Sequence, residues 1–314
     1  MRGYIASIQQ FCLLAILCVC MIALGQPAKA QVTIAQISDT HLGESHSPHA
    51  ADNLRRTVDM VNRRHPDAVV LSGDIGENPE EWQQARQILK GLKAPLYYAP
   101  GNHDVHSNDV AQYRNFFGPD YYSFKVKDIT FVVIDSQLLG NYDEFGLPAL
   151  QPMPPQTEAE GAKMLAALAH PDDRLGRDYK RRNVAQTADD QSGESKDQNQ
   201  GRDGDHDHGR IVIGIQHIPV FRDERVLPDP KPYWIITEPY RSHELALLHQ
   251  LGIKHMLVGH WHVGDVFERD GITWHVAPST SRMLPWSGQL GFAMHTISPD
   301  GDVKTEFVSL GTEQ

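Results

Sequence analysis

Cysteine is almost absent from this 314-residue chain: there are three, at positions 12, 18 and 20. The sequence after residue 20 therefore cannot form a disulfide or a zinc–thiolate site. A thiolate nucleophile is excluded for the same reason. Any metal ion must be bound by histidine, carboxylate and amide groups.

Positive charge is also scarce, because 29 basic residues face 40 acidic residues and give a net charge of -11. This balance argues against binding to nucleic-acid polymers, which are polyanions. It does not exclude a phosphate-bearing substrate, since a bound metal ion can dominate the local field. The hydrophobic content of 40% is enough for a large core, and the 17 histidines are the unusual feature of the composition.

The apolar segment at residues 11–25 is shorter than the ~20 residues that a membrane span needs. Arg2 precedes it, and Pro27-Ala28-Lys29-Ala30 follows it. This order predicts a signal peptide over residues 1–30 and an exported protein, periplasmic or secreted. The alternative is an uncleaved N-terminal anchor, and only that alternative would attach the chain to a membrane.

After residue 30, apolar runs alternate with amphipathic stretches, which predicts an α/β domain over residues 31–314 with two packed sheets. Asn78 is the expected N-cap of one helix, with Pro79 in its first turn and Glu81 reaching back. Thr157 and Glu160 form the expected capping box of another. The expected strands are 32–37, 68–72, 96–99, 129–135, 211–216 and 255–259, followed by hairpins over 263–277 and 292–310; further helices are expected over 53–64 and 243–251.

One segment differs from the rest of the domain. Residues 172–209 are almost wholly polar and cannot bury enough apolar surface to offset the entropy of ordering. We therefore expect a disordered surface insertion there.

Short polar clusters follow five of the expected strands, at the point where each strand ends. Ligand sites in open α/β sheets lie outside the carboxyl ends of the strands, so these clusters can converge on one place. They contain seven candidate metal ligands: Asp39, His41, Asp74, Asn102, His217, His260 and His262.

Seven ligands are more than one four-coordinate ion needs, and they suit a pair of ions that share a carboxylate. In Asp39-x-His41 and His260-x-His262, alternate residues on an extended backbone would point the same way. Taken alone, each cluster is a weak signal, because a lone Gly-Asp is usually a turn and a lone histidine is usually packed. Their order along the chain, each after a strand, makes coincidence a poor explanation.

The ordered set Asp39-x-His41, Gly73-Asp74, Gly101-Asn102-His103-Asp104, His217 and Gly259-His260-x-His262 resembles the calcineurin-like metallophosphoesterases. The resemblance implies a four-layer α/β/β/α sandwich with two central mixed sheets. It also implies that one metal takes Asp39, His41 and His262, that a second takes Asn102, His217 and His260, and that Asp74 bridges both.

In the mechanism that the resemblance implies, a hydroxide bridging the two metals attacks the phosphorus of a phosphomonoester or phosphodiester substrate. His103 matches the family histidine that contacts the phosphate and supports the leaving oxygen, and Asp104 is expected to orient His103. Nitrogen and oxygen ligands suit manganese, iron, zinc or cobalt.

The sequence differs from some subfamilies of this family, and these differences indicate which members it resembles less. Glu77 stands where purple acid phosphatases have an iron-binding tyrosine, so a purple ferric centre is not expected. The stretches 118–124, 135–137 and 216–221 are similar to a subgroup of single-domain phosphoesterases that includes serine/threonine phosphatases and relatives of class III cyclic-nucleotide phosphodiesterases.

Two alternatives stay open at this point. One is a phosphodiesterase specific for cyclic nucleotides or nucleotides, and the other is a metal-binding scaffold of the same fold without turnover. No sequence pattern indicates an oligomeric state. Tyr233, Trp234 and Trp286 are interpreted as packing residues, with stacking on a substrate ring as the alternative.

Overall fold

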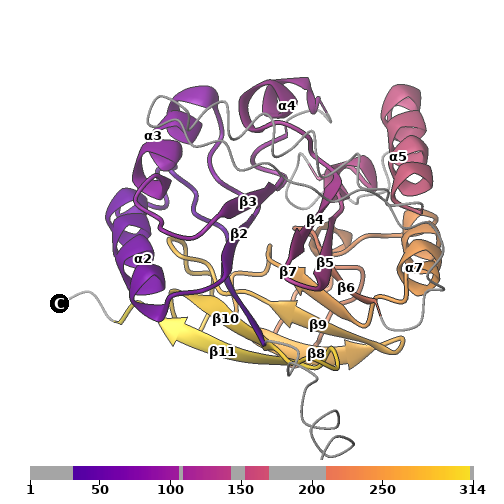
Figure 1. The fold of residues 1–314 in the computed structure, drawn as a ribbon. Helices are drawn as coiled ribbons and strands as arrows, with labels where there is room; N and C mark the ends of the chain where they lie inside the picture. Colours follow the sequence, from indigo (N-terminus) through magenta and orange to yellow (C-terminus); the bar gives the residue numbers. More distant parts are fainter. Residues whose placement is uncertain (1–30, 106–108, 143–152, 170–209, 312–314) are drawn as a thin grey trace, which may run out of the picture. The chain divides into compact units, whose positions relative to one another are not determined.

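The computed structural model describes residues 31–105, 109–142, 153–169 and 210–311. The predicted signal peptide and the whole of the predicted insertion lie outside these residues. Within them, the strands form two mixed sheets with helices on their outer faces, which confirms the predicted α/β/β/α fold class (Figure 1). In this part of the chain, no helix combines the length and apolar character that a bilayer crossing requires.

The first sheet has the strand order β11-β10-β1-β2-β3. Strands β1 to β3 are parallel, while β10 and β11 form an antiparallel hairpin that joins at β1. The parallel register places Ile37 opposite Leu71 and Leu71 opposite Tyr98, so the three strands end at the same edge. The strands of this sheet are β1 (Val32–Ile37), β2 (Ala68–Ser72), β3 (Leu96–Ala99), β10 (Gly291–Ile297) and β11 (Val303–Ser309).

The second sheet has the order β4-β5-β6-β7-β9-β8. Its central strands β5, β6, β7 and β9 are parallel, and β4 and β8 lie antiparallel at the two edges. Its strands are β4 (Tyr122–Val126), β5 (Ile129–Val133), β6 (Ile211–Ile215), β7 (His255–Val258), β8 (Asp265–Arg269) and β9 (Ile272–Val276).

The helices lie next to the strands that precede or follow them in the chain. Figure 1 shows α2 and α3 beside the first sheet, and α5 and α7 beside the second. The helices are α2 (Ala50–Arg64), α3 (Pro79–Leu89), α4 (Ala111–Phe117), α5 (Pro155–Leu168) and α7 (Tyr240–Gln250), with short 3-10 turns η2 (Ser136–Leu138) and η3 (Pro232–Trp234).

Successive residues of a strand point to opposite faces of its sheet, and this divides the buried residues into two clusters. Ile34 and Val70 of the first sheet share one buried cluster with Phe131 and Leu257 of the second, so the two sheets pack face to face. The neighbouring residues of β1 and β2 belong to another cluster that includes Leu54 of α2 and Trp82 of α3. Each strand of this part of the first sheet is therefore buried on both faces, as its continuous apolar sequence predicts.

A chain of polar side chains, for which the sequence showed no signal, connects strands of both sheets. His255 Nδ1 lies 3.0 Å from His275 Nε2, and His275 Nδ1 lies 2.7 Å from Thr305 Oγ1. The same hydroxyl lies 2.9 Å from His295 Nδ1, and His295 Nε2 lies 2.9 Å from Gln36 Oε1. His275 and His295 are fully buried and satisfied by these contacts.

Helix starts differ from the predictions in two places. Asn78 caps α3 by accepting a hydrogen bond from the Glu81 amide at 3.1 Å, as expected, but the Glu81 carboxylate accepts from the Glu77 amide rather than from Asn78. The Thr157–Glu160 capping box is wrong: α5 begins at Pro155, and Glu160 instead lies 3.3 Å from Arg114. A proline fits the first turn of a helix because it lacks the amide that would go unpaired there.

Candidate metal centre

The residues after β1 and β2 continue side by side beyond the sheet. The Asp39 amide donates to the Gly73 carbonyl, and the His41 amide to the Asp74 carbonyl, each at 3.0 Å. These bonds extend the pairing of the two strands into the loops. They explain why Asp39, His41 and Asp74 lie together at the carboxyl edge of the first sheet.

The backbone at these positions is not extended, which corrects the expectation from residue spacing. Asp39, His41, Asp74, His260 and His262 all have positive φ, between 42° and 72°. Such angles are uncommon for residues other than glycine, and they cluster where a site constrains the chain. The paired residues do lie close together, because of left-handed turns rather than strand alternation.

Gly73 is needed for the same close packing. It has a φ of 95°, and a Cβ atom there would lie 2.5 Å from His217 Nδ1 and 2.8 Å from the Cα of Gly101. Only glycine allows three strand ends to approach this closely.

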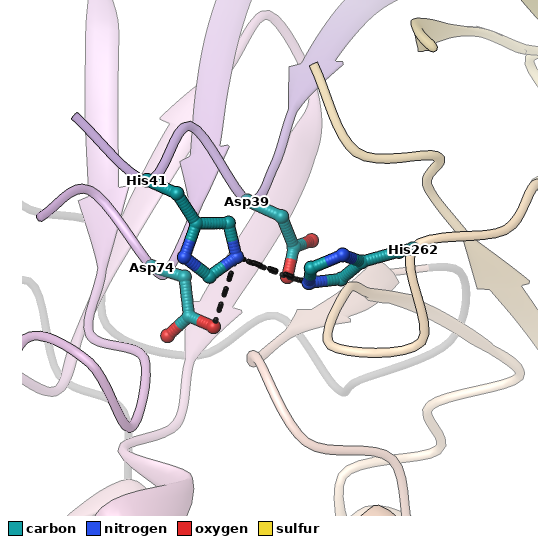
Figure 2. Close-up of side chains that lie close together, drawn as sticks. All are labelled: Asp39, His41, Asp74 and His262. Atoms are coloured by element: carbon teal, nitrogen blue, oxygen red, sulfur yellow. Dashed lines mark hydrogen bonds and ion pairs between the residues drawn. The ribbon is translucent and has the colours of Figure 1, made fainter. Parts of the chain in front are cut away.

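Two groups of possible metal ligands share Asp74. The first consists of Asp39, His41, Asp74 and His262, whose ligand atoms lie within 4.8 Å of one another. Figure 2 shows these four side chains pointing toward one another. His41 Nε2 lies 3.0 Å from His262 Nε2 and 3.8 Å from Asp74 Oδ2, and His262 Nε2 lies 3.1 Å from Asp39 Oδ1. All four residues are buried.

The second group consists of Asp74, His217 and His260, so Asp74 belongs to both groups. His217 Nε2 lies 3.0 Å from Asp74 Oδ2. Asn102 is also buried here, and its Nδ2 donates to the Tyr233 hydroxyl at 2.9 Å. The structure thus brings six of the seven candidate ligands into two groups that share Asp74, and Asn102 is linked to the second group through Tyr233, whose carbonyl contacts His260.

Each of the four histidines has one ring nitrogen bonded to an oxygen outside the cluster. His217 Nδ1 donates to the Ser72 carbonyl at 2.7 Å, His262 Nδ1 to the Arg282 carbonyl at 3.0 Å and His260 Nε2 to the Tyr233 carbonyl at 3.0 Å. His41 Nδ1 pairs with the Glu44 carboxylate. When a ring is neutral in this tautomer, its other nitrogen carries the lone pair that binds a metal ion. Burial lowers the pKa of His217, but the charge and hydrogen bond of Asp74 outweigh it and raise the pKa to about 9, so a metal ion at this ring would displace a proton.

Two further observations indicate that these ligand atoms suit a metal ion. His41 Nε2 and His262 Nε2 face each other at 3.0 Å, a separation suited to two nitrogens that each lie ~2.1 Å from one ion. Asn102 Oδ1 is buried and makes no hydrogen bond in the described residues. Asp39 Oδ1 and His217 Nε2 are also buried, and their polar neighbours are other ligands of the cluster, His262 Nε2 at 3.1 Å and Asp74 Oδ2 at 3.0 Å. Buried polar atoms that lack a partner outside the ligand groups are rare, and a bound cation would satisfy all three.

Electrostatics favour carboxylate anions at the centre. Burial raises the pKa of Asp39, but the charge and hydrogen bond of His262 outweigh it and the pKa lies at about 2. Burial likewise opposes ionisation of Asp74, yet the charges of His217 and His103 hold its pKa well below the ordinary value. Burial and the charge of His217 lower the pKa of His260 to about 3, which keeps that ring neutral. Two anions and a neutral imidazole are suitable ligands for a cation.

His103 lies at the rim of the cluster, with 23% of its side chain exposed. Its backbone amide donates to Asp74 Oδ1 at 3.0 Å, and its Nδ1 pairs with Glu77 and lies 3.2 Å from Glu44. Burial opposes protonation of the ring, but Asp74, Glu44 and Glu77 together raise its pKa to about 11.

Asp104 does not contact the His103 ring, so the expectation that it orients His103 is wrong. Its carboxylate accepts backbone hydrogen bonds from Ile75 at 2.9 Å, Gly76 at 3.3 Å and Gly101 at 2.9 Å. Burial, followed by the nearby charge of Asp74, raises the pKa of Asp104 to about 7. Asp104 therefore ties the loop after β3 to the loop after β2, a role that spacing alone does not reveal.

Glu44 and Glu77 are the site residues that sequence reasoning missed. The only feature of the sequence that could have indicated a role for Glu44 is its position three residues after His41. The aromatic residues pack as interpreted: Tyr233 and Trp234 are buried, and Trp286 Nε1 donates to the Trp261 carbonyl at 2.9 Å.

Comparison with known proteins agrees with this geometry. Residues 32–264 match the family model of the calcineurin-like phosphoesterases. The chain belongs to the calcineurin-like phosphoesterase family. It is accordingly a metal-dependent phosphoric ester hydrolase by family, with a cluster of aspartate and histidine residues able to bind metal ions.

Two curated relatives have different described activities. The chain is 44% identical over 80 residues to a glycerophosphodiester phosphodiesterase, GpdQ, of Enterobacter lignolyticus, a match that covers 23% of this chain and 29% of that protein. It is 24% identical over 264 residues to the serine/threonine-protein phosphatase CPPED1 of Danio rerio, covering 79% of this chain and 72% of that protein.

Among solved structures, a dimetal phosphatase from Danio rerio superposes with a TM-score of 0.55 at 13% identity, covering 91% of this chain and all of that one. A purple acid phosphatase from yellow lupin superposes with a TM-score of 0.54 at 11% identity, covering 90% of this chain and 52% of that one. At such identities the likeness concerns the fold alone.

Proposed function

We propose that this protein hydrolyses phosphomonoesters or phosphodiesters with two metal ions, one at each ligand group. Asp39, His41 and His262 would hold one ion, Asn102, His217 and His260 the other, and Asp74 both. The observation that carries the proposal is the pair of ligand groups that share Asp74, with each histidine held in a metal-binding tautomer. Manganese, iron, zinc and cobalt all suit this mixture of nitrogen and oxygen ligands.

Bound metal ions would supply positive charge for the phosphorus-centred transition state and lower the pKa of water in the site. The chain's own residues would complete the chemistry. His103 is the only histidine of the site with an appreciably exposed side chain among the described residues, so it can reach a bound ester. Its Nδ1 is held by Glu44 and Glu77, and its other nitrogen would give a proton to the leaving oxygen.

The direct experiment is a substrate panel with metal-loaded and chelator-stripped protein. We expect the loaded protein to hydrolyse p-nitrophenyl phosphate or bis(p-nitrophenyl) phosphate, and we expect chelation to abolish this activity. His103→Ala should lower kcat by ~10²–10⁴-fold with metal content unchanged, because it removes only the proton donor. Full hydrolysis by the stripped protein would contradict the proposal.

A preference for diesters is the second candidate, and the 44% identity to a glycerophosphodiester phosphodiesterase favours it. Adding cyclic AMP and glycerophosphodiesters to the panel distinguishes the two. A diesterase should cleave these faster than any monoester. Binding of metal without hydrolysis of any ester would instead favour a scaffold of the same fold.

We also propose that the protein is exported, on the basis of the signal-peptide pattern in residues 1–30. N-terminal sequencing of the protein recovered from a fractionated host should then begin near residue 31. Recovery of the intact N-terminus in the membrane fraction would favour the anchor instead.

A further inference from the structure

Glu44 joins two functional side chains of the site through a single carboxylate. Its side chain is 8% exposed, and Oε1 pairs with His41 Nδ1 while lying 3.2 Å from His103 Nδ1. His41 is a proposed metal ligand, and His103 is the proposed proton donor. No other carboxylate in the described residues is shown in contact with both rings.

The second oxygen of Glu44 connects this pair to a third histidine. Oε2 lies 3.4 Å from Arg282 Nη1, and the Arg282 carbonyl accepts the hydrogen bond from His262 Nδ1 at 3.0 Å. Nδ1 is the outer nitrogen of both rings. In His41 it pairs with Glu44, and in His262 it donates to Arg282, which Glu44 contacts. The inner nitrogens of the same two rings face each other at 3.0 Å.

We propose that Glu44 is a positioning residue that sets the tautomer and orientation of His41 for metal binding and holds His103 over the same site. The proposal rests on the two-metal function above. A carboxylate on the outer nitrogen of a metal-binding histidine fixes the ring and makes the inner nitrogen a better ligand. Sharing the carboxylate with His103 keeps the proton donor at a constant distance from the metal ligand.

The local chain supports this placement. The Glu44 amide donates to the His41 carbonyl at 3.4 Å, and Gly43 between them has a φ of 80°. This tight turn returns the Glu44 side chain to the ring of His41. A buried carboxylate costs free energy unless it is paired, and two imidazoles and a guanidinium provide the partners here.

The test is Glu44→Gln, measured by titrating chelator-stripped protein with Co²⁺ while recording its visible absorption. Glutamine keeps the size of the side chain but removes the charge that holds two rings. We expect one Co²⁺ to bind 10–100-fold more weakly, with an altered absorption spectrum. Glu44→Asp keeps the charge on a shorter side chain and should recover part of the affinity; it also provides the measurement if Glu44→Gln does not fold.

Two matched variants separate this role from a loss of negative charge. Glu77→Gln removes a carboxylate that contacts His103 but not His41, so it should slow hydrolysis and leave Co²⁺ affinity within about twofold. Glu268→Gln removes the same charge from an exposed position on β8 and should change neither property. The melting temperature of each stripped variant reports any purely structural effect.

The outcomes distinguish this proposal from the proposed function. Wild-type hydrolysis with unchanged Co²⁺ affinity and spectrum in Glu44→Gln would overturn the positioning role and leave the function standing. Co²⁺ binding by wild type without any hydrolysis would overturn the function, while the comparison of affinities would still decide the role of Glu44. An equal loss of affinity in Glu44→Gln and Glu77→Gln would also overturn the positioning role.

Discussion

We predict that the buried histidine chain that connects the two sheets destabilises the protein at acid pH, and the pKa of His275 gives the size of the effect. Its side chain is 1% exposed, and burial followed by the charge of His255 lowers its pKa from 6.5 to about 3. Because its folded pKa is depressed, the unfolded chain binds more protons between these two values. Stability is therefore fully present above about pH 6.5 and is lost as the pH falls toward 3.

Linkage gives the size of the effect. With pKa values of 6.5 unfolded and about 3 folded, His275 alone lowers the free energy of unfolding by ~2 kcal/mol between pH 7 and pH 5. His295 changes stability in the same direction, since burial and its histidine neighbours hold its pKa well below the ordinary value. Urea unfolding of chelated protein at several pH values measures the sum without a contribution from metal release.

Comparison with His275→Gln isolates the single residue. Glutamine keeps hydrogen-bonding groups but cannot take up a proton, so the variant should lose ~2 kcal/mol less than wild type over this pH interval. His243→Gln, at an exposed position, is the matched control and should follow wild type. Equal pH dependence of wild type and His275→Gln would refute the reasoning.

Three further predictions concern the metal centre. Gly73→Ala should lower the free energy of unfolding by ~2–4 kcal/mol, because alanine is strained at a φ of 95° and its Cβ would lie 2.5 Å from His217 Nδ1. Urea unfolding measures this change, and a urea midpoint equal to that of wild type would contradict it. Asp104→Asn should cost ~1–3 kcal/mol in the same assay, since one of three backbone amides loses its acceptor, and no change would mean that these bonds are dispensable. Metal at 100 times its Kd should raise the free energy of unfolding by ~2.7 kcal/mol, which is measured as a higher Tm. Asp74→Asn should show no such increase. An increase equal to that of wild type would contradict the claim that Asp74 is a ligand of both ions.

Much of the fold was predictable because its central strands, such as β2 and β5, are short apolar runs buried on both faces. The expected strand at 68–72 matches β2 to the residue. Strand β4 and helix α4 were not expected, although Tyr122–Val126 and Ala111–Phe117 are real elements. The short α4 and the polar residues of β4 leave periodicity weak in both.

The ligand positions were predictable from polar residues at strand ends, but the way in which they meet was not. Positive φ at Asp39 and His41 depends on hydrogen bonds to the neighbouring loop, which lies more than thirty residues away in sequence. Asp104 was wrongly predicted to orient His103, because its carboxylate accepts hydrogen bonds from backbone amides and a side-chain motif does not indicate such bonds. The histidine chain was missed since its members come from five different strands.

The central claim is that Asp74 joins two metal ions in one hydrolytic site. Elemental analysis of the purified protein together with hydrolysis of bis(p-nitrophenyl) phosphate, compared between wild type and Asp74→Asn, tests it most directly. We predict about two metal ions per chain and measurable hydrolysis for wild type, with both lost in Asp74→Asn. Undiminished metal content and hydrolysis in Asp74→Asn would contradict the account.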